Sequence, residues 1–336
     1  MADTILFTER SMDGRLGAVV DATDGVVYLY LQELTEGKTF GMKACWVRNL
    51  KAAPKTVALD GRGRPPALPA ECCGHPQGGA PIDPKSLSVV WFEEGDGVAL
   101  FERDQLLAII PGWSGIQGFA GYARDCIADS PLCWPLPEGE DMLERIERAR
   151  EYWASWHQPP GKMFWPGYQD SLLKAYQSLG TQTNYYSIDS GGWPPMGVVQ
   201  LSTGDGVTVL ATVGMSVRPM PGVEMALEDP VGHRRVELAI ALRGHDTEAL
   251  ARQLSGLARY PWGLMTWFGQ GHTVPFTGLA GKPAVLLCKA GPDIAMPGFR
   301  GDPINLLWLV GITEAQRNQA MGQGSDSLAE GLDWVN

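Results

Sequence analysis

Alternating apolar and polar positions predict strands in the first half of the chain. The run Val26–Glu33 is rich in β-branched and aromatic residues, and Leu87–Phe92 and Val98–Phe101 have the same character. The last two runs are joined by EEGDG, which is typical of a hairpin because Asp96-Gly97 tolerates the positive φ angles of tight turns. Residues 51–86 are rich in Pro, Gly and Ala and predict an irregular surface loop.

Large apolar residues at three- and four-residue spacing predict one long helix from near Glu138 to His157. Acidic residues fill its first turn, where negative charge suits the helix dipole. Its apolar stripe, typical of a core-facing helix, consists of Met142, Ile146, Ala149, Trp153 and Trp156. The breaker cluster Pro159-Pro160-Gly161 ends the helix, so we expect an N-terminal α+β module over residues 1–162 and a second domain over 163–336.

The second half combines strands with separate helices, which is typical of an α+β fold. In Val236–Arg243 every second residue is aliphatic, which predicts a strand with one buried face. The continuous apolar runs Ala284–Cys288 and Asn305–Ile312 are typical of central strands. Further strands are predicted at Gly197–Leu201 and Val207–Val213. Helices are predicted at Tyr168–Leu179, after the capping residue Asp246, and after the capping-box pair Thr313 and Gln316.

Charge narrows the classes of partner. The chain has 27 Lys and Arg against 38 Asp and Glu, a formal net charge of -11, and both halves are acidic. Such a field repels phosphate backbones and anionic membranes, so we expect no direct nucleic-acid or membrane binding. No secretory leader is expected at the charged N-terminus, and Ile304–Ile312 is too short for a membrane span. We therefore expect a soluble, cytoplasmic protein whose six cysteines remain thiols.

Motifs for catalysis and cofactor binding are weak. The glycines do not form a phosphate-binding loop, and the sequence around Ser114 lacks the GxSxG spacing. Cys72, Cys73 and His75 have no second ligand pair to complete a zinc site. His272 has no Asp, Glu or Cys within ten residues. We expect no enzyme activity, cofactor or metal, and a hydrolase that uses His272 remains the alternative.

Acidic loops and one tryptophan are the residues expected to contact a partner, because loops often carry binding and Trp is a frequent hot spot. Neighbouring carboxylates on a strand face opposite sides, so exposed charge is a better interpretation of these pairs than a metal site. The expected contact residues are Glu93, Glu94, Asp96, Asp189, Trp193, Glu224, Glu228 and Asp229. For Trp193, core packing remains an alternative.

Four stretches resemble the suppressor-of-fused domain in order and spacing, over about residues 184–333. These are Ala211–Met220, Val236–Arg243, Ala258–Phe276 and Ile304–Leu332. The positions that recur in this resemblance have an architectural character: Gly214, Met215, Arg218, Pro219, Met220, Tyr260, Pro261, Trp267, Gly271, His272, Ser325 and Asp326. The preceding region, with CWVRNL and IIPGWSG, is similar to the extra N-terminal module of longer bacterial members.

The resemblance implies a mixed sheet flanked by helices in the second domain and a scaffold or inhibitor function without catalytic residues. Bacterial members are often immunity proteins that neutralise polymorphic or type VI secreted toxins. An acidic inhibitor suits a basic cleft, and a nuclease has one because it must hold phosphates. We therefore expect a cognate nuclease effector as the partner. A general scaffold or regulator is the alternative.

Overall fold

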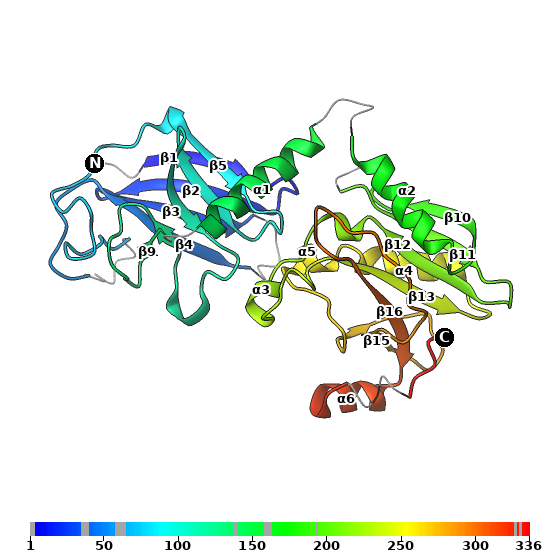
Figure 1. Ribbon diagram of the computed structural model, residues 1–336. Helices are drawn as coiled ribbons and strands as arrows, with labels where there is room; N and C mark the ends of the chain where they lie inside the picture. The colour runs from blue at the N-terminus through cyan, green and yellow to red at the C-terminus, as the bar shows by residue number, and fades with distance from the viewer. Residues whose placement is uncertain are drawn as a thin grey trace. The chain divides into compact units, whose positions relative to one another are not determined.

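The computed structural model describes residues 4–34, 40–57, 65–136, 140–157, 163–191, 194–325, 328 and 331–336. The chain divides into two compact units, Met1–Gln158 and Pro159–Asn336, which we name the N-terminal and C-terminal units. Both units combine helices with β-sheets, which confirms the predicted α+β class (Figure 1).

Two sheets form the N-terminal unit. The first is antiparallel, with the order β1-β2-β3-β4, and the second has the order β5-β6-β7-β8-β9. The strands are β1 (Thr4–Arg10), β2 (Leu16–Thr23), β3 (Val26–Glu33), β4 (Met42–Asn49), β5 (Leu87–Trp91), β6 (Val98–Glu102), β7 (Gln105–Ile110), β8 (Tyr122–Ala123) and β9 (Trp134–Pro135). In the described part of residues 51–86, the helices and strands are limited to a 3₁₀ turn at Pro84–Ser86, as expected of an irregular loop.

The predicted hairpin is present as β5 and β6, in which Trp91 pairs with Val98. The positive φ of its turn lies at Gly95, however, and not at the predicted Asp96-Gly97. Gly97 has a different requirement, because a Cβ there would lie only 2.9 Å from the carbonyl oxygen of Ile110 on the neighbouring strand.

Helix α1 (Glu140–Trp156) is the long helix that the apolar stripe predicted, although residues 138 and 139 lie outside the described ranges. Its Ile146 and Ala149 are buried in one cluster with Ile109 of β7 and with Phe92, which directly follows β5. Near its end, the indole of Trp153 donates a hydrogen bond of 2.7 Å to the carbonyl oxygen of Trp91. The helix is thereby fixed along the β5–β6 hairpin.

One mixed sheet dominates the C-terminal unit, with the order β10-β11-β12-β13-β16-β15-β14. Its strands are β10 (Thr181–Ser187), β11 (Gly197–Ser202), β12 (Thr208–Val213), β13 (Val236–Leu242), β14 (Thr273–Pro275), β15 (Ala284–Cys288) and β16 (Asn305–Ile312). The central pair β13 and β16 is parallel, and the other neighbours are antiparallel. β14 and β10 are therefore the outer strands.

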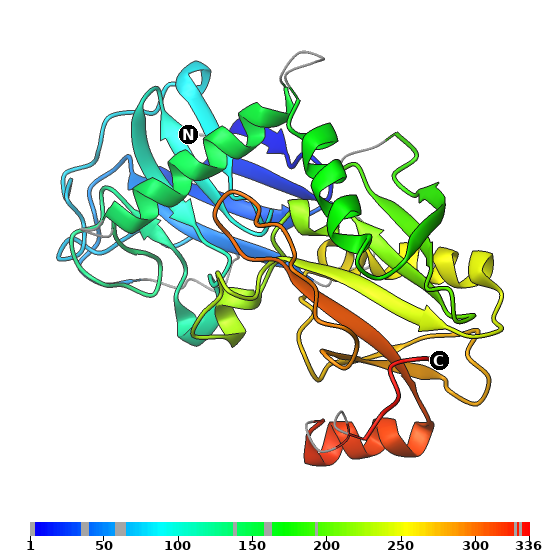
Figure 2. The same cartoon turned by 45° about the vertical axis from the view of Figure 1, so that its right-hand side comes forward.

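Helices cover both faces of this sheet, and α2 and α4 lie on opposite faces in both views (Figures 1 and 2). The helices are α2 (Trp165–Tyr176), α3 (Val223–Ala226), α4 (Thr247–Leu257), α5 (Tyr260–Leu264) and α6 (Glu314–Gln323). Asp246 caps α4 by accepting from two backbone N–H groups, and Thr313 with Gln316 forms the predicted capping box of α6. The helix predicted at Tyr168–Leu179 begins earlier, at Trp165, and ends at Tyr176.

The prediction of a single buried face for Val236–Arg243 is wrong. Every residue of β13 is buried, because the strand lies in the middle of the sheet and both of its faces are covered. Leu238 and Ile240 belong to the main core with Leu250 and Leu254 of α4. Glu237 faces the other side and is nevertheless fully buried.

Candidate functional site

The acidic turn at Glu93, Glu94 and Asp96 faces inward. These side chains are only 4%, 3% and 4% exposed, so the exposure predicted for them is wrong. Helix α1 supplies the cations: Arg148 donates to Glu93 over 2.9 Å, and Arg145 lies 3.2 Å from Glu94. Carboxylates can be buried when they are paired in this way, and here they hold the turn against α1.

The other predicted contact residues lie in the C-terminal unit. Asp189 is half-buried and accepts hydrogen bonds from the backbone N–H groups of Gly191 and Met196, at 2.7 and 3.0 Å. Trp193 lies outside the described residues. Glu224 lies within α3 and is half-buried, whereas Glu228 and Asp229 follow this helix and are exposed.

The two candidate nucleophile or base residues have structural hydrogen bonds. The hydroxyl of Ser114 is buried and donates to the carbonyl oxygen of Ala120. His272 accepts a 3.3 Å hydrogen bond from the N–H of Gly269 at its Nδ1, and its ring packs edge-on against Trp267 at 4.4 Å between centroids. Burial lowers the pKa of His272, which favours the neutral imidazole.

His272 lines a hollow of about 340 Å³ beside the outer strand β14, which we name the aromatic hollow. Tyr260 and Trp267 form part of its wall, and Met321 of α6 reaches it with a side chain that is 62% exposed. Gly271 has a φ of 88°, and a Cβ there would collide with the hydroxyl of Ser325. The hollow thus gathers Tyr260, Trp267, Gly271 and His272, positions on which the family resemblance was based. No local sequence pattern indicates that these four positions form one surface.

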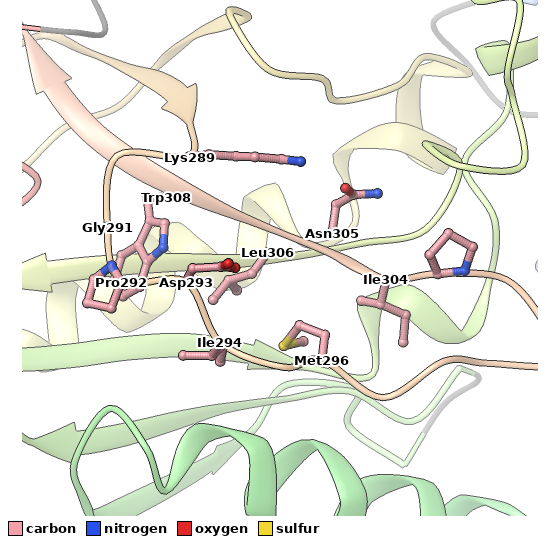
Figure 3. A pocket seen from close by; sticks show the side chains of 11 residues that line it. Lys289, Gly291, Pro292, Asp293, Ile294, Met296, Ile304, Asn305, Leu306 and Trp308 are labelled. Carbon is pink, nitrogen blue, oxygen red and sulfur yellow. The ribbon is translucent and has the colours of Figure 1, made fainter.

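A second hollow, of about 450 Å³, lies between β16 and the connection 289–304 (Figure 3). We name it the Trp308 hollow. Figure 3 shows Lys289 extending toward Asn305, with Asp293 beside Leu306. None of the residues that line this hollow was among the predicted contact residues.

Buried charges anchor the connection 289–304 to the sheet. Arg234 donates to both carboxylate oxygens of Asp302, at 2.9 and 3.0 Å, and Arg235 donates to one of them at 2.7 Å. Arg235 also donates to the carbonyl oxygens of Ser216 and Val217. This Asp302 clasp fixes the far end of the connection beside β13.

Glu237 provides a second buried polar centre. It accepts hydrogen bonds from the hydroxyls of Thr212 and Ser216 and from the N–H groups of Gly214 and Ser216, at 2.9 and 3.1 Å. Burial raises the pKa of this carboxyl to about 7, although the hydrogen bonds act in the opposite direction.

The described residues offer neither a cluster of metal ligands nor a membrane-spanning helix. Among the described residues, no three His, Cys, Asp or Glu side chains lie together in a way that could hold a metal ion. Within the same ranges, no helix is both long enough and apolar enough to cross a bilayer. All six cysteines are free and buried.

One region of the chain matches a known protein family. Residues 192–334 match the family model of the suppressor of fused protein. A solved structure of a suppressor of fused homolog from Neisseria gonorrhoeae FA 1090 is 16% identical, with 51% of this chain and 94% of that chain covered and a TM-score of 0.36. No curated protein matches.

Proposed function

Because residues 192–334 match the suppressor of fused family model, we propose that this chain is a non-catalytic, cytoplasmic protein that binds another protein at the aromatic hollow. The observation that carries the proposal is the grouping of Tyr260, Trp267, His272 and Met321 beside an outer strand.

The chemistry of the hollow fits a polypeptide partner. Trp, Tyr and Met are enriched at the centres of protein interfaces, where they offer large contact areas. Among the described residues β14 pairs with β15 on one side only, so its other edge could take up an extended segment of a partner. A hydrolase that uses His272 is supported less well, because Nδ1 already accepts a backbone hydrogen bond and the ring packs on Trp267.

For the partner, we propose a secreted toxin, which would make the chain an immunity protein, and among toxins a nuclease effector. The support is electrostatic: a net charge of -11 complements the basic cleft with which a nuclease holds phosphates. A general scaffold or regulator remains the second candidate. Co-expression of this chain with the toxin encoded beside its gene distinguishes the two candidates, because only an immunity protein should keep the cells alive. If that toxin acts on cell wall or lipid, the proposed nuclease partner is excluded.

The test of the binding surface compares two methionines of similar exposure. Met321 is 62% exposed at the aromatic hollow, and Met42 is 64% exposed on β4 of the other unit. After the partner is identified by pull-down from the native host and mass spectrometry, we expect Met321→Glu to weaken its affinity about tenfold or more, because a charge enters an apolar contact. Met42→Glu should leave the affinity unchanged. Equal affinities for both variants and the parent protein would exclude this surface.

A further inference from the structure

The Trp308 hollow is held open by packing within its own unit. The Asp302 clasp fixes one end of the connection 289–304, and Phe299 packs on Tyr168 of α2 at 4.7 Å between ring centroids. At the other end, a Cβ at Gly291 would collide with the indole ring of Trp308, so only glycine permits this approach. Trp308 in turn packs edge-on against Trp334. A wall held at both ends is typical of a preformed ligand site.

Two opposite charges line this hollow. Lys289 and Asp293 are both exposed, and within the described part of the chain neither has a hydrogen bond or an ion pair. Asn305 donates through Nδ2 to the carbonyl oxygen of Gly232 at 2.7 Å. Its own amide oxygen has no donor among the described residues and remains an acceptor.

The remaining lining is largely apolar. Ile294, Met296 and Leu306 are half-buried at this hollow. A ligand that reached only the two charges would gain little, because solvent-exposed ion pairs are weak. A ligand that also covers these apolar groups gains burial and excludes water from the ion pairs.

We propose that the Trp308 hollow binds a zwitterionic ligand, a free amino acid or a short peptide that carries an apolar side chain. Lys289 pairs with its carboxylate, Asp293 and the amide oxygen of Asn305 receive its ammonium group, and Ile294, Met296 and Leu306 contact the side chain. A volume of about 450 Å³ lies within the range of small-ligand sites and accommodates either a free amino acid or a short peptide.

Isothermal titration calorimetry of the full chain tests this assignment with leucine and leucyl-leucine as probes. We expect heat of binding for at least one of the two, and the stronger binder distinguishes an amino-acid site from a peptide site. N-acetylation of that probe removes its ammonium group, and amidation removes its carboxylate. Each change should weaken binding about tenfold or more, the effect of losing one charge-assisted hydrogen bond.

Variants identify the groups involved. Lys289→Met should bind the probe with a free carboxylate no better than the amidated probe. Asp293→Asn should bind the probe with a free amine no better than the N-acetylated probe. Lys174→Met and Asp170→Asn, at exposed positions of α2, serve as matched controls and should behave like the parent protein. Met321→Glu should also leave this binding unchanged, because the aromatic hollow is a different site.

The proposal is overturned if the folded parent protein gives no heat with either probe at millimolar concentration. It is also overturned if Lys289→Met and Asp293→Asn bind all forms of the probe as the parent protein does. Thermal unfolding of each variant establishes that it is folded, and both substitutions lie at exposed positions where a change of charge is tolerated.

Discussion

At the scale of single residues, buried ionisable groups have the largest consequences. Glu237 lies on a strand that is buried on both faces, and its carboxyl is satisfied by hydroxyl and N–H donors. The same burial raises its pKa from 4.5 to about 7. Hydrogen bonds alone therefore do not compensate for the loss of hydration in this position.

The raised pKa of Glu237 predicts a pH-dependent stability. As the pH rises, the unfolded chain releases this proton near pH 4.5, whereas the folded protein keeps it until about pH 7. The contribution of Glu237 to the free energy of unfolding is thus largest below pH 4.5 and is lost between pH 4.5 and 7. The loss is on the order of 3 kcal/mol.

Urea unfolding of the parent protein and of Glu237→Gln at several pH values measures this effect. The variant has no proton to release, so its stability should fall less than that of the parent protein between pH 4.5 and 7. Glu248→Gln, at an exposed position of α4, is the control and should follow the parent protein. Parallel pH profiles for the parent protein and Glu237→Gln would contradict the prediction.

At the scale of elements, the connection 289–304 depends on long-range ion pairs rather than on secondary structure of its own. Asp302 receives hydrogen bonds from two consecutive arginines, Arg234 and Arg235, directly before β13. All three side chains are buried. Removing one partner of a buried ion pair leaves the other charge uncompensated, which costs far more than the pair contributes.

Asp302→Asn should therefore lower the free energy of unfolding by about 3–5 kcal/mol, because Arg234 and Arg235 lose their charged acceptor. Asp293→Asn is the matched control on the same connection. Its carboxylate is exposed and has no ion pair among the described residues, so we expect a change within about 0.5 kcal/mol. Chemical denaturation of both variants measures the difference, and equal stabilities would show that the clasp is not structural.

At the scale of the whole molecule, the boundaries of the family match differ from those of the compact unit. The match covers residues 192–334, whereas the C-terminal unit begins at Pro159. The additional residues include α2 and β10. Leu172 and Tyr176 of α2 are fully buried, and the hydroxyl of Tyr176 donates to the carbonyl oxygen of Thr212 at 2.8 Å. The unit therefore needs more of the chain than the match contains.

Two fragments test this conclusion. Residues 159–336 should unfold in one cooperative transition, because the main core of the sheet is formed within this unit. Residues 192–334 lack α2 and β10 and should lose cooperativity, since the face of β12 that α2 covers becomes exposed. Circular dichroism during thermal unfolding follows both. A cooperative transition in the shorter fragment would assign α2 a minor role.

Local pattern explains which elements were predictable. Apolar runs gave β15 and β16 with their observed ends, and the capping residues Asp246 and Thr313 located the starts of α4 and α6. The hairpin of β2 and β3 was missed, although its signal was present: Asp24-Gly25 has positive φ at both positions and joins the paired residues Thr23 and Val26.

The sequence alone determined the fold class and those strands and helices that have a clear hydrophobic period or capping residues, because these signals act between near neighbours. Burial of charge was decided only by the tertiary structure. Glu93 is covered because Arg148 reaches it from α1, and Glu237 because β13 lies in the middle of a sheet covered on both faces. The aromatic hollow likewise exists because chain folding brings α6 to the turn before β14. Contacts between residues distant in the sequence leave no local pattern. The surfaces proposed to bind a partner or a ligand could therefore be identified only from the tertiary structure.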